Sequence, residues 1–414
     1  MFFEASIVLT SGNADNIIVL NNKRRVIMMF YGIWSFVRQS FVRVHLAFAG
    51  MIYKISGGKL PKSLFAKRSG VEKVGTSVKV IERNGHVANI AKFNPDGTIS
   101  DDDFIILSST DFHYDTDHEM NQKTTTMFVN HIKAVKPDLV VLTGDVILSK
   151  YQQIDAIQFA KMMEEIGIYW AITFGNHEVR EEKGFYKYLL MKSFSDYEHC
   201  LAVHGPDELF GYGNYIVNIM GSKNNIRQSL FFFDSGRDVR EEYTEQYGLP
   251  KDFGGYDFLK KEQIEFYKNS VDELEKKHGK FGSMMYFHIP IPEFEVAFEG
   301  SGGAEEYKQT GNAEVLYGKQ YESVGSPKYN SGMFDAALEK GATAIFCGHD
   351  HNNDWCAIYK GIRLCYNLPQ NYNLYHLGTN MGFPEEKWNQ GVTVTTLHAD
   401  GSLDMAPRYN SIYL

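Results

Sequence analysis

The chain has 414 residues, of which 43% are hydrophobic, 14% aromatic and 22% charged, and its net charge is −9. This composition is typical of a globular protein and allows a large core. Four cysteines are too few for a scaffold held by disulfides, and no Cys-x-x-Cys pair is present that would indicate a thiolate zinc site.

The first segment, residues 1–73, is a basic and apolar arm. It has no Asp or Glu between Asn16 and Val71, whereas Lys and Arg recur through residues 23–68. Its apolar stretch is interrupted by Arg38 and Arg43 and is too short to span a bilayer. We therefore expect a helix that lies on an anionic membrane surface. A helix buried against the rest of the protein is the alternative, and the location stays open between cytoplasmic, membrane-associated and extracytoplasmic.

The next segment, residues 74–103, has the pattern of a β-hairpin that leads into the main domain. Two turn signals, Asn84-Gly85 and Pro95-Asp96-Gly97, separate alternating apolar and polar residues. This pattern predicts one or two hairpins.

From residue 104 to residue 414 apolar runs alternate with helical patterns. The runs "DFIILSSTDFH", "PDLVVLTGD" and "IYWAITFGNHE" are separated by helices expected at about 123–135 and 154–166. This alternation is typical of an α/β domain whose sheet is covered on both faces. Ligands in such folds bind beyond the carboxyl ends of the strands.

Further strands are expected later in the chain. "RQSLFFFDSG", "GSMMYFHIP" and "AIFCGHDH" are apolar runs, and "WCAIYKGIRLCYN" predicts a hairpin that turns at Lys360-Gly361. This turn would place Cys356 opposite Cys365, either as a disulfide or as two packed thiols. Residues 300–325 have little periodicity and predict a long loop near the site.

Potential metal ligands follow these apolar runs. They are widely separated in the sequence and consist of Asp111, His113, Asp145, Asn176, His177, His288, His349 and His351. Oxygen and imidazole ligands together suit Mn, Fe or Zn better than Ca. Each short motif is common by itself, but their joint occurrence in order indicates a centre for two divalent cations.

These motifs resemble the calcineurin-like metallophosphoesterase family. Asp-x-His at 111, Gly-Asp at 144, Gly-Asn-His-Glu at 175, His288 and Gly-His-x-His at 348 carry the resemblance, which is greatest to the branch related to purple acid phosphatases. It implies an α/β fold, a β-sandwich flanked by helices in α/β/β/α layers. One position departs from the purple enzymes, because Leu148 stands where they have a tyrosine.

The resemblance implies a role for each residue. Asp111, His113 and His351 would hold one metal ion, and Asn176, His288 and His349 would hold the other. Asp145 would bridge the two ions. His177 would be a catalytic acid rather than a ligand, with Glu178 orienting it, and Asn176, His177 and Arg180 would contact the substrate.

The predicted activity is hydrolysis of phosphate monoesters by attack of a metal-bound hydroxide. Its substrate would be a phosphorylated small molecule or a phosphoprotein. A phosphodiesterase acting on nucleotides or lipid headgroups is one alternative, and a non-catalytic, membrane-tethered binding protein is another. Nucleic acid is not expected as the main partner.

Overall fold

The computed structural model describes residues 70–115, 117–178, 184–298 and 313–414. The predicted surface helix within residues 23–68 and the candidate substrate residue Arg180 lie outside these ranges. Among the residues that are described, no helix combines the length and the hydropathy needed to cross a membrane.

A five-stranded sheet carries the first group of candidate ligands. Its order is β14-β13-β3-β4-β5. The strands are β3 (Phe104–Ser109), β4 (Leu139–Leu142), β5 (Trp170–Ile172), β13 (Gly391–Leu397) and β14 (Leu403–Tyr409). Strands β3, β4 and β5 run parallel, and β13 pairs with β3 in the antiparallel direction. The parallel βαβ units expected from the apolar runs are therefore present.

The two helices of these βαβ units begin earlier than the apolar periodicity indicates. They are α2 (His118–Val135) and α3 (Gln152–Ile166). Asp117 caps α2, because its carboxylate accepts hydrogen bonds from the amides of Glu119 and Met120. The polar first turn of α2 contributes little to the apolar pattern, which explains the difference.

A nine-stranded sheet carries the second group of candidate ligands. Its order is β1-β2-β6-β7-β8-β10-β12-β11-β9. The strands are β1 (Val78–Asn84), β2 (Val87–Lys92), β6 (Tyr215–Met220), β7 (Ile226–Phe232), β8 (Gly282–Tyr286), β9 (Glu314–Tyr317), β10 (Ala342–Cys347), β11 (Cys356–Tyr359) and β12 (Ile362–Tyr366).

The side chains of β7 show how the layers pack. Leu230 and Phe232 lie in the core shared with the five-stranded sheet, whereas Phe231 and the residue that follows β7, Phe233, lie in a second core. Successive strand residues point to opposite faces, so the two cores lie on opposite sides of the nine-stranded sheet. The first core also takes side chains from α2 and α3, and the second takes side chains from α6 and α8. This is the predicted α/β/β/α arrangement.

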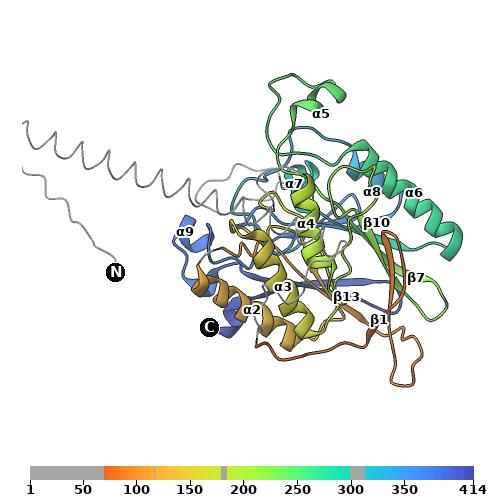
Figure 1. The fold of residues 1–414 in the computed structure, drawn as a ribbon. Helices are drawn as coiled ribbons and strands as arrows, with labels where there is room; N and C mark the ends of the chain where they lie inside the picture. The colour runs from red at the N-terminus through yellow and green to blue at the C-terminus, as the bar shows by residue number, and fades with distance from the viewer. Residues whose placement is uncertain (1–69, 116, 179–183, 299–312) are drawn as a thin grey trace, which may run out of the picture. The chain divides into compact units, whose positions relative to one another are not determined.

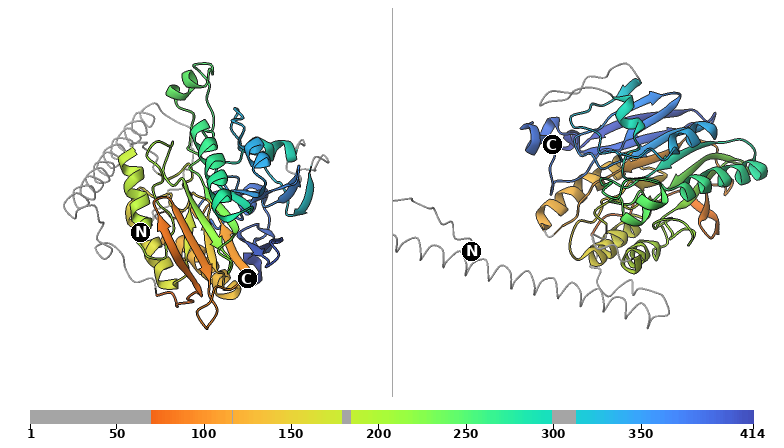
Figure 2. Two further views of the ribbon diagram at one scale, coloured as in Figure 1. Left: turned by 90° about the vertical axis from the view of Figure 1, so that its right-hand side faces the viewer. Right: turned by 90° about the horizontal axis from the view of Figure 1, so that it is seen from above.

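The remaining helices complete the outer layers and the loops. They are α4 (Gly184–Ser195), α5 (Glu241–Gln246), α6 (Lys261–His278), α7 (Glu293–Ala297), α8 (Met333–Glu339), α9 (Leu377–Met381) and the 3-10 helices η1 (Glu385–Lys387) and η2 (Asn410–Tyr413). Figure 1 shows α2 and α3 on one side of the strands and α6 and α8 on the other, and Figure 2 shows the strands between these helices.

The predicted hairpins occur, with two additions. Strands β1 and β2 pair around the Asn84-Gly85 signal, but β2 also pairs with β6, so the hairpin is the edge of the nine-stranded sheet. Within the expected loop 300–325, residues 314–317 form β9 on the opposite edge, next to β11. Across β11 and β12, Cys356 and Cys365 pair as a disulfide.

Candidate metal centre

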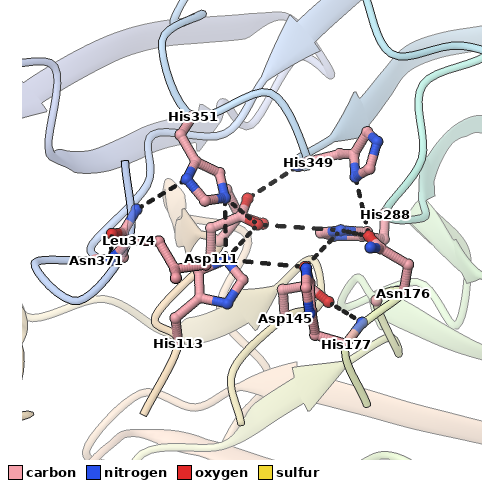
Figure 3. Close-up of polar contacts among 12 residues, drawn as sticks. Asp111, His113, Asp145, Asn176, His177, His288, His349, His351, Asn371 and Leu374 are labelled. Carbon is pink, nitrogen blue, oxygen red and sulfur yellow. Dashed lines mark hydrogen bonds and ion pairs between the residues drawn. The ribbon is translucent and has the colours of Figure 1, made fainter. Parts of the chain in front are cut away.

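The candidate ligands follow strands of both sheets. Asp111 and His113 follow β3, Asp145 follows β4 and Asn176 follows β5 in the five-stranded sheet. His288 follows β8 in the nine-stranded sheet, and the pair His349 and His351 follows β10. Figure 3 shows these side chains pointing toward one another in one place.

The glycines that precede two of the candidate ligands are required by close packing at this edge. A Cβ atom at Gly144 would lie 2.6 Å from the Gly175 nitrogen and 2.8 Å from Nδ1 of His288. A Cβ atom at Gly175 would overlap Oδ1 of Asp145. The Gly-Asp and Gly-Asn-His motifs therefore have a steric cause, because the backbones of β4 and β5 approach each other where they deliver their ligands.

Four candidate ligand residues have left-handed backbone conformations. The φ angles are 51° at Asp111, 49° at His113, 51° at Asp145 and 80° at His349. Such a conformation costs a non-glycine residue of order 1–3 kcal/mol and persists where the surrounding structure imposes it. The fold therefore bears a conformational cost at the positions that direct these side chains inward.

One cluster consists of Asp111, His113 and His351. The Nε2 atoms of the two imidazoles are 3.0 Å apart. Oδ1 of Asp111 lies 3.2 Å from Nε2 of His113 and 3.4 Å from Nε2 of His351. The three residues are buried and form one of the groups whose ligand atoms are close enough to hold a single ion.

A second cluster lies beside it and contains Asn176, His288 and His349. Oδ1 of Asn176 is 2.9 Å from Nε2 of His288 and 2.9 Å from Nδ1 of His349. Nε2 of His288 is also 3.2 Å from Oδ2 of Asp145. One amide oxygen, one carboxylate oxygen and two imidazole nitrogens thus converge.

Both carboxylates lie between the clusters. Oδ2 of Asp145 is 3.8 Å from Nε2 of His113 and 3.2 Å from Nε2 of His288, one nitrogen from each cluster. Oδ1 of Asp111 is closer to the first cluster, since it lies 4.0 Å from the His288 nitrogen. Asp111 and Asp145 both belong to the second ion-holding group together with His288. Asp111 is therefore common to both groups, and the bridging role expected of Asp145 stays a prediction.

The residues fit divalent cations. Oδ1 of Asp111 is buried and has no hydrogen-bond donor among the described residues. Burial lowers the pKa of His349 to about 3, so this ring is neutral and can offer a lone pair. Burial also opposes charge on His288, but Asp145 and Asp111 outweigh it and raise its pKa to about 10. Two buried carboxylates that draw positive charge to this place suit cations bound by oxygen and nitrogen.

His177 differs from the ligands in exposure. Its side chain is 31% exposed, and Nε2 lies 3.9 Å from Oδ2 of Asp145. Its backbone amide donates a 2.7 Å hydrogen bond to Oδ1 of the same aspartate. The ring therefore stands at the rim of the centre, where a substrate can reach it.

Glu178 contacts the backbone rather than the solvent. Its carboxylate accepts hydrogen bonds from the amides of Asp145, Ile147 and Gly175 at 2.8, 2.9 and 2.6 Å. These bonds join the loops after β4 and β5, so Glu178 is a positioning residue for Asp145 and Asn176. The sequence had linked it to the orientation of the His177 ring.

The sequence motif at residues 348–354 has a further use that the sequence alone did not indicate. Asp350 accepts hydrogen bonds from the Gly325 amide, and Oδ1 of Asn353 accepts from the amides of Tyr321 and Glu322. Asp354 accepts from the Lys319 amide at 2.7 Å. We call residues 319–325 the tethered segment, because these three side chains fasten it beside the centre.

Comparison with known proteins agrees with this geometry. Residues 104–353 match the family described as Calcineurin-like phosphoesterase. An Arabidopsis thaliana protein named "Probable inactive purple acid phosphatase 14" is 30% identical over 325 residues, which are 69% of this chain and 73% of that protein. Phosphatase DCR2 of Saccharomyces cerevisiae is 31% identical over 245 residues, 56% of this chain and 39% of that protein.

A solved structure of a dimetal phosphatase from Danio rerio covers 74% of this chain and 96% of its own, with 12% identity and a TM-score of 0.42. The family match covers more than half of the chain and includes the seven candidate ligands. This protein therefore belongs to the calcineurin-like phosphoesterase family, in the branch related to purple acid phosphatases, and is a phosphoric ester hydrolase.

Proposed function

We propose that this protein is a phosphomonoesterase that depends on two transition-metal ions. The observation that carries the proposal is the convergence of seven side chains from both sheets into two adjacent clusters with carboxylates between them. Asp111, His113 and His351 would hold one ion. Asn176, His288 and His349 would hold the other, and Asp145 would contact both.

Bound cations would supply charge neutralisation to a phosphate group and would lower the pKa of a water molecule toward about 7, which provides the nucleophile for in-line attack. The seven residues act by fixing the two positions rigidly, because their backbones are constrained at the strand ends. Mn, Fe and Zn all accept this set of oxygen and nitrogen ligands.

His177 would supply the proton that the leaving group needs. When the bond between phosphorus and the ester oxygen breaks, that oxygen takes a proton from the imidazolium, and the alcohol and phosphate leave. The position of His177 at the rim of the centre supports this role. The hydrogen bond from its backbone amide to Asp145 fixes the residue relative to the carboxylate that would be shared. Such an acid contributes about 10²–10⁴-fold to the rate.

The relative from Arabidopsis carries the word inactive in its name, so a binding protein without catalysis is the natural competitor. A binding protein would not need buried, left-handed residues that deliver carboxylates and imidazoles to one place, since such residues cost stability. The full set of ligands in this chain favours turnover.

The proposal is tested with Asp145→Asn and with Asp272→Asn as a matched control, because Asp272 pairs with Lys340 away from the centre. We expect the purified wild type to contain about two transition-metal ions and to hydrolyse monoesters faster than diesters when Mn, Fe or Zn is supplied. Asp145→Asn should lose turnover while staying folded, and the control should keep it. A preference for diesters, or normal turnover in Asp145→Asn, would refute the proposal.

A further inference from the structure

A second cavity lies beside the proposed metal centre, and we call it the side cavity. Its lining includes Gly175 and Glu178, the residues on either side of Asn176 and His177. The side cavity and the proposed centre therefore share one loop. The other walls come from α4, from α5 and from the loops that precede β6 and follow β7. The volume is about 380 Å³, which lies within the range of small-molecule sites.

The side cavity has more cationic side chains than carboxylates. Its charged and ionisable lining consists of Lys187, Arg237, Arg240 and His204 together with Asp207 and Glu178. Three backbone amides already stabilise the Glu178 carboxylate, and the Asp207 side chain is 97% exposed and screened by solvent. A chain with a net charge of −9 thus gathers a lysine and two arginines around one hollow.

One buried carboxylate fixes three walls of the side cavity. Asp234 is inaccessible to solvent, and its Oδ2 lies 2.6 Å from Nζ of Lys187 on α4. The same oxygen accepts a 2.8 Å hydrogen bond from the Tyr212 amide before β6, and Oδ1 accepts a 3.0 Å bond from the Gly236 amide after β7. The side cavity is therefore preformed, which lowers the entropic cost of binding a ligand there.

Lys187 can donate to a further acceptor. Its ammonium group has three N–H donors, and the ion pair with Asp234 uses one of them. The side chain is 18% exposed and lines the side cavity, so an anion bound there can reach it. Asp234 meanwhile holds the ammonium group in position.

The two arginines are paired with carboxylates on the protein surface. Nε of Arg237 lies 2.9 Å from Asp238, and Nη1 of Arg240 lies 3.3 Å from Glu242. These acidic side chains are 61% and 62% exposed, and ion pairs of this kind are weak enough to be exchanged for a better-placed anion. A guanidinium group presents five N–H donors in one plane, which suits two oxygen atoms of a phosphate group.

We propose that the side cavity is a binding site for a phosphate oxyanion, separate from the two proposed metal positions. Lys187, Arg237 and Arg240 bind the anion through charge-assisted hydrogen bonds. The anion arrives either as free inorganic phosphate or as a second phosphate group of a substrate whose scissile ester lies at the metal centre. The first source is independent of the proposed function, and the second rests on it.

Arginine modification of the wild type tests the site without a variant. Phenylglyoxal reacts with accessible guanidinium groups, and mass spectrometry reports the extent of reaction at each arginine. At a phosphate concentration of about 10 times Kd, we expect Arg237 and Arg240 of the metal-loaded full chain to react about 10-fold more slowly, since only the free site reacts. Arg363 lies outside the side cavity and should react as before, with chloride balancing the ionic strength. Equal rates with and without phosphate at Arg237 and Arg240 would overturn the proposal.

Calorimetric titration with inorganic phosphate separates the site from the metal centre. We expect two phosphate ions per wild-type chain, one at each place. Arg237→Gln and Arg240→Gln should each weaken one of them about 10-fold and retain the other. Asp145→Asn should weaken only the other, and the control Arg363→Gln neither.

The two proposals fail in different ways in this titration. A single phosphate ion per chain that the arginine variants do not affect would overturn the site in the side cavity and leave the proposed function standing. A single phosphate ion that is weakened in the arginine variants and unchanged in Asp145→Asn would support the site and count against the proposed function.

Kinetics identify the source of the anion. Hexyl phosphate and hexanediol bisphosphate differ in the second phosphate group. If the substrate carries the anion, KM for the bisphosphate should be about 10-fold lower than for hexyl phosphate in wild type, and Arg240→Gln should remove the difference. Equal KM values in wild type, with the arginines still protected by inorganic phosphate, would identify the free ion as the ligand.

Discussion

The role proposed for His177 separates proton transfer from metal binding at the level of a single residue. His177→Ala removes the ring at the rim but none of the seven proposed ligands. We expect kcat to fall about 10²–10⁴-fold, because the leaving oxygen loses its acid. Metal content, measured by elemental analysis, should stay close to that of wild type. Loss of metal in this variant would identify His177 as a ligand instead.

Glu178 has a different effect, because it acts on the backbone. In Glu178→Gln one acceptor oxygen becomes an NH₂ group that faces a backbone amide, so at least one of the three buried hydrogen bonds is lost. We expect the free energy of unfolding to fall by about 1–3 kcal/mol, together with weaker metal binding. Denaturant titration and metal titration measure the two effects. Unchanged stability would show that these bonds are not needed to hold the two loops.

The convergence of the candidate ligands could be predicted from the sequence, because each follows an apolar run that ends in a short motif. Two tyrosines that contact candidate ligands, Tyr256 and Tyr375, could not be predicted in this way. Tyr256 lies between α5 and α6 and Tyr375 precedes α9, in segments without an apolar period, and only the folded chain places them against His349 and His351. The hydrogen bonds that the Glu178 carboxylate accepts could not be predicted either, because they depend on how the loops after β4 and β5 meet in the folded chain.

At the level of elements, strand signals were clearest where a strand is wholly buried, as in β4, where each residue is inaccessible. They were weak for β9, whose exposed edge alternates without a strong apolar run. Helix α6 has a strongly polar outer face and was not expected, although it covers the nine-stranded sheet. Its amphipathic pattern is dominated by charge, which hides the few buried positions.

The tethered segment gives a prediction at this level. Asn353→Ala removes the acceptor for two backbone amides of the tethered segment. Asn330→Ala serves as the control, because it removes exposed contacts with Glu293 and with the Gly332 amide, outside that segment. We expect amide hydrogen exchange in residues 319–325 to accelerate at least 10-fold in Asn353→Ala and to stay unchanged in the control. Equal exchange in both variants would show that the segment is held by other contacts.

For the whole molecule, the important feature is that each cluster takes ligands from both sheets. Ions bound there would join the two sheets. They would bind the folded chain and not the unfolded chain, in which the ligands are far apart. At a free metal concentration 100 times the dissociation constant, we expect each bound ion to raise the free energy of unfolding by about 2.7 kcal/mol. Thermal unfolding with and without added Mn or Zn measures this. A chelator should reverse the gain, and Asp145→Asn should show less of it; a Tm unaffected by metal in wild type would contradict it.

The layered architecture was predictable as a whole, since it follows from the family that the motifs resemble. How the chain passes between the layers was not. It enters the nine-stranded sheet with β1 and β2, leaves it for β3 to β5, returns for β6 to β12 and leaves again for β13 and β14. Pairings between strands so far apart depend on side-chain fit in three dimensions, and short-range patterns do not encode them.

The last two strands contribute no ligand, yet β13 is the neighbour of β3, which ends just before Asp111. A stop codon placed before Gly391 would therefore leave every proposed metal ligand in the gene product and still expose one edge of β3 to water. Truncation at the C-terminus would therefore disturb the position of Asp111, although the lost strands supply none of the candidate ligands.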